Sequence, residues 1–223
     1  MAPVAERGLW LGPESIAAHR ADLAAFVERA ARIDPAAVIR LRSRSGSLVT
    51  AWVATGFDVL ASRVVAGTLR PDDLSVGADE LTRGLAAADT SGYVHPGFPM
   101  DSAWRGALPP DSGFAHLDDV PARLMLDLAQ RGAQLAKEHG SAQGPPVSLL
   151  DQEVIRVSSA DLSVGVPMRC VFALTAMGFL PQSAENVDAD EIVRIRTLPA
   201  WLRIDARFGS VYRRRGDPAL VLR

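Results

Sequence analysis

The residues best suited to catalysis lie in one irregular stretch, residues 89–119. His95 and Asp101 fall within the segment His-Pro-Gly-Phe-Pro-Met-Asp, and Trp104 follows shortly after it. A histidine beside a carboxylate can act as a general base, because it can take a proton from a substrate held nearby. An enzyme built on this stretch would have a loop pocket formed by His95, Asp101 and Trp104, with Phe98 in its floor.

The same stretch has a simpler interpretation. Two histidines and an aspartate can bind a metal ion, but His95 and His116 are 21 positions apart and match no standard ligand spacing. Polar side chains in irregular backbone commonly satisfy buried N–H and C=O groups instead. The sequence therefore predicts no metal site and no cofactor, and it singles out no catalytic residue.

A second cluster is rich in arginine and lies near the C-terminus. Residues 192–215 contain seven arginines and a single acid, Asp205. Side chains alternate across a strand, so Trp201, Arg203 and Arg207 share one strand face with Asp205. The predicted nucleic-acid or anion site comprises Arg194, Arg196, Trp201, Arg203, Arg207, Arg213, Arg214 and Arg215.

Such a face suits single-stranded nucleic acid, because guanidinium groups contact phosphates and an exposed ring stacks on a base. Two alternatives remain open. The arginines can pair with acids elsewhere on a solvated sheet face, or they can protect an edge strand from aggregation. No recognisable nucleic-acid-binding motif accompanies the cluster.

Composition restricts the class of protein. The 223 residues are 48% apolar and 22% charged, with a net charge of −2, so global charge predicts no polyanionic partner. All but one of the basic residues are arginine, which a GC-rich bacterial genome explains.

Cys170 is the single cysteine, which favours a reducing cytoplasm, and its apolar neighbours predict a buried thiol. The longest apolar stretch, residues 166–180, contains Arg169 and is shorter than the ~20 residues of a membrane span. Residues 1–8 carry Glu6 and Arg7 and no long apolar core, so no signal peptide is expected.

The first part of the chain predicts helices around a β-meander. Apolar residues at helical spacing predict a helix over 16–33 that ends before a proline. A second helix is expected over 76–87, and residues 89–119 should form a loop that packs on the body. Short spacers between three β-rich runs predict an antiparallel meander. These runs are residues 38–42, 48–54 and 57–65.

The remainder repeats the same ingredients. Acids and an early proline at 118–121 predict the start of a helix whose buried stripe holds Val120, Leu124, Leu128 and Leu135. A Gly/Pro-rich linker at 141–146 is the expected boundary, giving domains 1–140 and 147–223, with one continuous domain as the alternative. The second domain should contain a strand over 153–158, a buried helix over 166–180 and a meander of runs 192–196, 201–208 and 211–215.

One pentapeptide occurs twice. Asp-Leu-Ser-Val-Gly stands at 73–77 and again at 161–165, each time after a strand-like run and before a helix-like one. This favours two pseudo-related halves. However, the meander comes first in one half and last in the other, which a simple tandem duplication does not produce, and known repeat families have a fixed period. Chance similarity stays open as the alternative.

The sequence therefore predicts an α+β fold in which antiparallel β-meanders pack against about four helices. The leading functional hypothesis is a non-catalytic cytoplasmic binding or assembly protein that self-associates, as a homo-oligomer or with a protein partner. One alternative is a nucleic-acid-binding protein that uses the C-terminal arginine and tryptophan face. The other is an enzyme with its site on residues 89–119. No membrane partner is expected.

Overall fold

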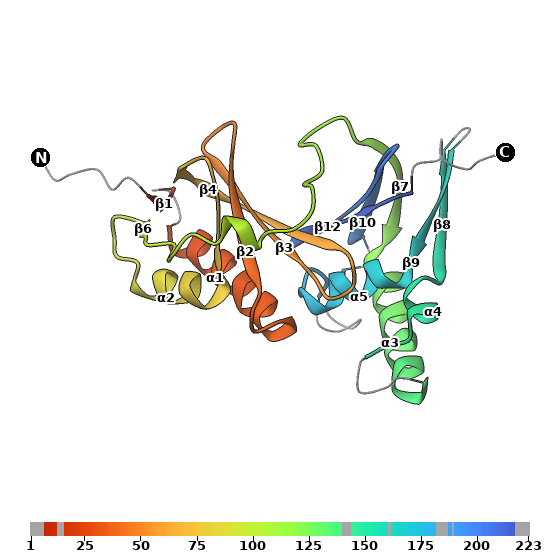
Figure 1. Cartoon of the computed structure of the whole chain (residues 1–223). Coiled ribbons are helices and arrows are strands. Elements are labelled where there is room, and N and C mark those ends of the chain that lie inside the picture. The colour runs from red at the N-terminus through yellow and green to blue at the C-terminus, as the bar shows by residue number, and fades with distance from the viewer. Residues whose placement is uncertain are drawn as a thin grey trace, which may run out of the picture. The chain divides into compact units, whose positions relative to one another are not determined.

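A computed structural model describes residues 7–12, 16–139, 144–159, 162–181, 187–188 and 190–216 (Figure 1). The chain forms two compact units. Unit 1 comprises residues 1–56 and 62–107, and unit 2 comprises residues 57–61 and 108–223. The division near residue 107 precedes the 141–146 linker that composition singles out. Residues 141–143 of that linker lie outside the described residues, and residues 144–146 directly precede a short helix of unit 2. A Gly/Pro-rich stretch need not mark a domain boundary.

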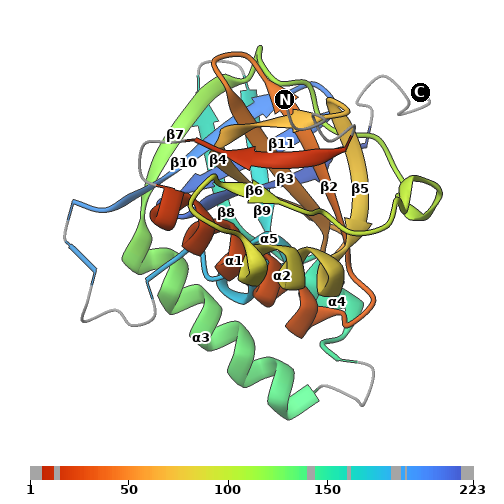
Figure 2. The ribbon, with the colours of Figure 1, turned by 90° about the vertical axis from the view of Figure 1, so that its left-hand side faces the viewer.

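Unit 1 combines an antiparallel sheet with two helices. Its elements are β1 (Gly8–Leu11), α1 (Ile16–Ile33), β2 (Val38–Arg44), β3 (Leu48–Ala54), β4 (Leu60–Arg70, whose first two residues belong to unit 2), β5 (Asp73–Gly77), α2 (Ala78–Ala87), β6 (Tyr93–Val94) and the 3₁₀ turn η1 (Asp101–Ala103). The strand order is β5-β2-β3-β4, and β1 pairs with both β4 and β6. Helices α1 and α2 lie side by side (Figure 2) and bury Phe26, Val27 and Leu81.

Unit 2 has the same kind of architecture. Its elements are β7 (Ala115–Pro121), α3 (Ala122–His139), α4 (Val147–Leu150), β8 (Glu153–Ser159), β9 (Leu162–Pro167), α5 (Met168–Ala176), β10 (Ile192–Leu198), β11 (Trp201–Ala206) and β12 (Gly209–Arg214). The order β12-β11-β10-β7 is antiparallel, and β8 pairs with β9 separately. Helices α3 and α5 pack together. The predicted α+β class and both meanders are confirmed, and the described residues contain five α-helices.

In each unit, the strand before the first helix pairs with a strand that follows a later helix. In unit 1, β1 precedes α1 but pairs with β6, which follows α2, whereas β5 precedes α2 and pairs with β2, which follows α1. In unit 2, β7 precedes α3 but pairs with β10, which follows α5, whereas β9 precedes α5 and pairs with β8. The two units therefore share one pairing scheme.

The repeated pentapeptide falls at equivalent places in this scheme. Residues 73–77 form β5, and residues 162–165 begin β9, while Asp161 lies outside the described residues. Strand β5 runs directly into α2, and β9 runs directly into α5. In unit 1 the meander follows α1, and in unit 2 it follows α5, which accounts for the changed order along the sequence.

One predicted helix start is wrong. The acids at 118–119 and Pro121 belong to β7, and α3 begins only at Ala122, where the backbone N–H bonds to the Glu191 carbonyl at 2.8 Å. The predicted buried stripe is also wrong, because Leu124 and Leu135 are about 40% exposed. The face of α3 that packs is one position further along the chain and contains Met125, Leu126, Ala129 and Gly132.

Helix α5 is buried as predicted, and its one charged residue is satisfied inside unit 2. Arg169 is 7% exposed, donates to the Phe57 carbonyl at 2.7 Å, and binds Asp151 at 2.5 Å. Because α5 is core, its apolar character does not support self-association. None of the helices in the described ranges is long and apolar enough to cross a membrane.

Three other elements differ from the predictions. Strand β1 and helix α4 have four residues each, which is too short to give a recognisable sequence pattern. The third strand of the first meander is Leu60–Arg70 instead of 57–65, because Asp58 adopts a left-handed conformation (φ 56°) and prolongs the preceding turn. Residues 89–119 are largely irregular, as expected, until β7 begins at Ala115.

Candidate functional site

The arginine groove is a depression of about 410 Å³ on the meander of unit 2. It is lined by Ile192, Arg194, Arg196, Arg203, Asp205, Ala206 and Arg207. Alternation along β10 and β11 places Arg194 and Arg196, and Arg203 and Asp205, on one sheet face, and Arg207 follows just beyond the end of β11. The register sets Arg196 opposite Arg203 and Arg194 opposite Asp205, so four guanidinium groups gather around one central carboxylate.

Acids at the centre and the margins position these arginines. Asp205 binds Arg203 at 2.7 Å and lies 3.6 Å from Arg196. Arg194 makes two hydrogen bonds to Asp119 of β7, at 2.9 and 3.2 Å. Arg207 lies 3.5 Å from Glu191, and its side chain is 59% exposed. Four cations face three carboxylates, so the groove keeps one positive charge in excess with its guanidinium groups already oriented.

The ion pair of Asp119 and Arg194, at the edge of the arginine groove, shifts the pKa of both residues. The Arg194 guanidinium, with help from His116, lowers the pKa of Asp119 from 3.8 to about 2. In turn, the hydrogen bonds that Arg194 donates to Asp119 raise the pKa of Arg194 above its ordinary value. Charge-assisted bonds of this kind favour the ionised forms of both partners. Asp119 is therefore a site residue that the sequence did not single out, because its position suggested a helix start.

Aromatic rings lie against two arginines of the groove, and the Arg207 guanidinium is 5.5 Å from the Phe208 ring centroid. The Arg203 guanidinium lies 5.6 Å from the Phe114 ring centroid and 5.4 Å from the Tyr212 centroid. The expectation that Trp201 offers an exposed stacking platform is wrong, because Trp201 is only 9% exposed. Tyr212 is likewise 6% exposed. The described face thus offers guanidinium groups to a ligand far more than it offers rings.

The three remaining predicted arginines, Arg213, Arg214 and Arg215, have different surroundings. Arg213 approaches Asp151 at 3.3 Å, beside buried Arg169, and therefore lies away from the groove. Arg214 is exposed on β12. Arg215 donates to the Thr197 hydroxyl at 3.0 Å. The structure thus gathers Arg194, Arg196, Arg203 and Arg207 into one site. Of the other predicted residues, Trp201, Arg213, Arg214 and Arg215 do not line it.

The predicted loop pocket does not assemble as expected. Asp101 accepts a hydrogen bond from the Ser75 backbone N–H at 2.6 Å, and His95 Nδ1 accepts one from the Gly97 N–H at 3.2 Å. Trp104 donates to the Gly106 carbonyl and lies under the Arg40 guanidinium, at 5.8 Å. Phe98 is 78% exposed, so its predicted place in a pocket floor is wrong. These polar groups serve the backbone, which is the alternative that the sequence left open.

The described residues contain no group of three or more His, Cys, Asp or Glu side chains close enough to hold a metal ion. Cys170 is 1% exposed, and burial raises its pKa to about 12. Its thiol is therefore neutral and inaccessible in the folded unit.

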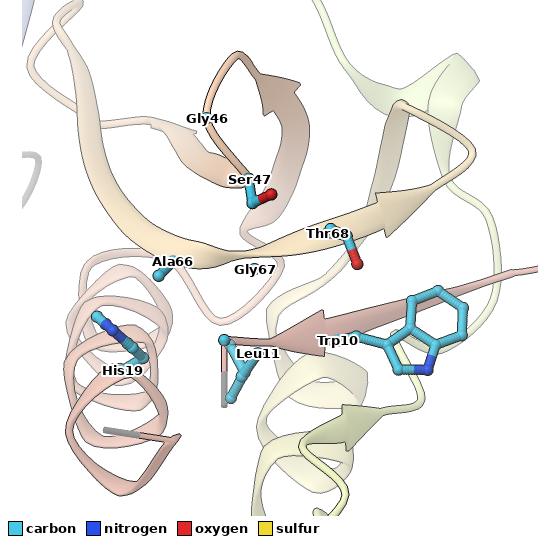
Figure 3. A pocket seen from close by; sticks show the side chains of 9 residues that line it. Trp10, Leu11, His19, Gly46, Ser47, Ala66, Gly67 and Thr68 are labelled. Carbon is cyan, nitrogen blue, oxygen red and sulfur yellow. The ribbon is translucent and has the colours of Figure 1, made fainter. Parts of the chain in front are cut away.

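An apolar pocket of about 420 Å³ lies in unit 1 between β1, β4, α1 and the β2–β3 turn (Figure 3). Its lining residues are Trp10, Leu11, Gly12, His19, Gly46, Ser47, Ala66, Gly67 and Thr68. His19 and Trp10 stand at opposite ends with Leu11 between them. Sequence reasoning missed this pocket because β1 was not predicted.

Comparison with known proteins follows the division into two units. Residues 5–106 match a family model described as a domain of unknown function, DUF8010, and residues 109–218 match another, DUF8185. No curated protein matches the chain in sequence.

Solved structures decide the fold. A putative DNA polymerase III beta subunit from Eubacterium rectale superposes with a TM-score of 0.56 at 11% identity, over 94% of this chain and 65% of that one. The chain has a sliding-clamp fold. The beta subunit of Streptococcus pyogenes DNA polymerase gives a TM-score of 0.55 at 12% identity, over 97% of this chain and 67% of that one.

A Caulobacter crescentus beta sliding clamp gives a TM-score of 0.57 at 11% identity, over 97% of this chain and 68% of that one. The present chain thus spans about two thirds of the length of these clamps. Identities this low establish the sliding-clamp fold and leave activity and partners to proposal.

Proposed function

We propose that this chain is a non-catalytic assembly protein that self-associates and serves as a binding platform. The observation that supports this best is the sliding-clamp fold, which extends over 94–97% of the chain in structures named as clamps and polymerase subunits. Two units with one pairing scheme offer repeated surfaces, which suits a protein that binds other molecules. The single cysteine, Cys170, supports a cytoplasmic location.

Light scattering coupled to size-exclusion chromatography over a wide concentration range tests this proposal. Self-association predicts a molar mass that is a multiple of the 23.8 kDa chain and that falls on dilution. A mass that stays at one chain at every concentration would contradict it.

A second function, nucleic-acid binding, is favoured by one observation, the four arginines of the arginine groove. Their guanidinium groups are oriented by Asp119, Asp205 and Glu191, so little conformational entropy remains to be lost when a phosphate binds. Because Trp201 is buried, phosphate contacts would dominate over base stacking, and the binding would show little sequence preference.

Fluorescence anisotropy with a labelled oligonucleotide at two salt concentrations tests this second function. Replacing Arg194 and Arg207 with alanine should reduce the slope of log affinity against log salt by up to about 0.7 for each lost phosphate contact to a single strand. Arg156→Ala is the matched control, because Arg156 is exposed on β8 and lies outside the groove. Equal slopes for all variants would remove the groove from consideration.

A further inference from the structure

Phe98 is the most exposed of the large apolar side chains in the described residues, at 78%. Aromatic side chains are enriched in protein interfaces relative to the rest of the surface. The Gly97 carbonyl accepts a hydrogen bond from Arg7, and the Met100 N–H donates to the Ser75 carbonyl at 2.8 Å. The chain therefore presents Phe98 to solvent on a fixed base.

Gly97 shows how closely that base is packed. It has φ +90°, in the left-handed region, and a Cβ atom there would overlap the side chain of Glu80 on α2. A rigid loop loses little conformational entropy on binding, so an aromatic side chain that it presents is well suited to anchor an interface.

The apolar pocket of unit 1 is suited to receive such a ring. Its walls offer the indole of Trp10, the imidazole of His19 and the methyl groups of Leu11, all of which pack well against an aromatic side chain. Gly67 lets β1 lie close against β4 at the pocket wall, because a Cβ atom at this position would lie 2.5 Å from the Trp10 carbonyl oxygen. A volume of about 420 Å³ leaves ample room for one aromatic side chain.

Charge also distinguishes the two surfaces. Asp79 and Glu80 stand in the first turn of α2, against which the Phe98 loop packs, and Asp101 follows in that loop. Arg83 pairs with both helix acids, and Arg7 binds the Gly97 carbonyl, so three acids face two arginines and one negative charge is in excess. Beside the pocket, Arg44 precedes the β2–β3 turn, and Arg70 follows Thr68 on the same exposed side of β4. Neither arginine forms an ion pair with any other described residue. Opposite charges around an apolar anchor orient an association.

We propose that Phe98 of one copy of this chain inserts into the apolar pocket of a second copy, with the acidic end of α2 facing Arg44 and Arg70. This rests on the self-association proposed above and gives it a surface. Because anchor and pocket are different surfaces of the same unit, the contact is heterologous, and each copy keeps a free anchor or a free pocket for the next one.

Two single variants and their mixture test the proposal. Phe98→Ala removes the anchor, and Thr68→Trp fills the pocket from an exposed position of β4. Each variant alone should weaken self-association at least about thirtyfold, the loss typical of an interface hot spot. The equimolar mixture should form a complex of two chains and no larger species, since only one intact anchor and one intact pocket meet.

Phe208→Ala and Val64→Trp are the matched controls. Phe208 is a 40% exposed aromatic in unit 2, and Val64 is a 39% exposed residue of β4 that does not line the pocket. Both should assemble like the parent chain, and circular dichroism should show that all four variants are folded.

The outcomes separate the two proposals. If the parent chain and Phe98→Ala assemble equally, the anchor is wrong while self-association stands. If Phe98→Ala dissociates but the mixture forms no two-chain complex, Phe98 contacts a surface other than this pocket. A parent chain that is monomeric throughout overturns self-association and the anchor together.

Discussion

The two meanders share a topology but differ in what covers them. In unit 1, the central strand β3 is buried on both faces, and even Thr50 and Trp52 are no more than 4% exposed. In unit 2, the central strand β11 buries Leu202 and Ile204 but leaves Arg203 and Asp205 partly open to the arginine groove. A shared pairing scheme therefore fixes the backbone, while covering segments decide which face is available for binding.

The central loop, residues 89–114, covers strands β2 and β5 of unit 1. In unit 1, Trp104 covers Arg40 of β2, while Arg40 also binds Asp73 with two bonds of 2.7 Å. Met100 and Asp101 occupy the backbone groups of Ser75 on β5, which protects that edge from further pairing. In unit 2, the corresponding stack of Phe114 on Arg203 covers only one of the four arginines in the groove.

The largest effect should come from removing the buried arginine of unit 2. Arg169→Ala leaves the Phe57 carbonyl without its donor and leaves Asp151 with the longer contact to Arg213, at 3.3 Å. Because Asp151 is also 47% exposed, we expect a loss of about 2–3 kcal/mol, below the full cost of breaking a buried pair. Cys170 reports unit 2 specifically, since it reacts with thiol reagents only when its burial is lost. Its labelling should accelerate strongly in Arg169→Ala.

Arg156→Ala is the control for that measurement. Arg156 pairs with Glu153 on the surface, its side chain is 73% exposed, and its loss should change stability by less than about 1 kcal/mol. Equal Cys170 labelling rates in the two variants would show that Arg169 does not stabilise unit 2.

In unit 1, the largest effect is expected where the central loop meets α2. A Cβ atom at Gly84 would overlap the backbone carbonyl of His95, so Gly84→Ala should cost about 1–3 kcal/mol even though alanine favours helices. Gly56→Ala has no neighbour within 4 Å and should lie within about 0.5 kcal/mol of the parent. Urea unfolding followed by tryptophan fluorescence measures both, and a neutral Gly84→Ala would show that the loop is not held against α2.

The stacked arginines should contribute less. Trp104→Ala removes the ring under Arg40 and should cost about 0.5–1 kcal/mol. Phe114→Ala should cost about 1–2 kcal/mol, because this ring also makes an edge contact with Tyr212 at 5.9 Å. The reverse order in urea unfolding would mean that the unit 1 stack is the stronger one.

The smallest effect concerns pH. The folded-state pKa of Asp119, about 2, lies below its ordinary 3.8, so its pair with Arg194 stabilises unit 2 above pH 3.8 and is lost as pH falls toward 2. In Arg194→Ala, the pKa of Asp119 should return toward 3.8, which NMR titration of the side-chain carboxyl carbon measures. An unchanged pKa would assign the shift to another neighbour of Asp119.

Local sequence patterns predicted most of the fold. Helix α1, both meanders and the burial of α5 follow from hydrophobic periodicity and from the Gly and Pro residues that separate the elements. Strand β7 did not, because Asp118, Asp119 and Pro121 resemble a helix start when their partner on β10 is unknown. The pairing of β1 with β6, and of β7 with β10, is non-local and leaves no short-range pattern.

The candidate sites show the same limit. Alternation correctly placed Arg203, Asp205 and Arg207 together, because a strand fixes its faces. The exclusion of Arg213, the burial of Trp201 and the role of Asp119 depend on contacts between distant segments. Phe98 was noticed as part of an unusual motif, but only the structure shows that its ring lies in solvent.

The pairing of β1 with β6, and of β7 with β10, affects how the chain folds during its synthesis. On the ribosome, β1 emerges early and has no β6 to pair with until most of unit 1 has been synthesised, and β7 waits for β10 in the same way. Contacts so distant in sequence slow folding and leave strand edges exposed in the nascent chain. The delay should make each unit dependent on chaperones during synthesis, and it gives neighbouring nascent chains the opportunity to trade strands.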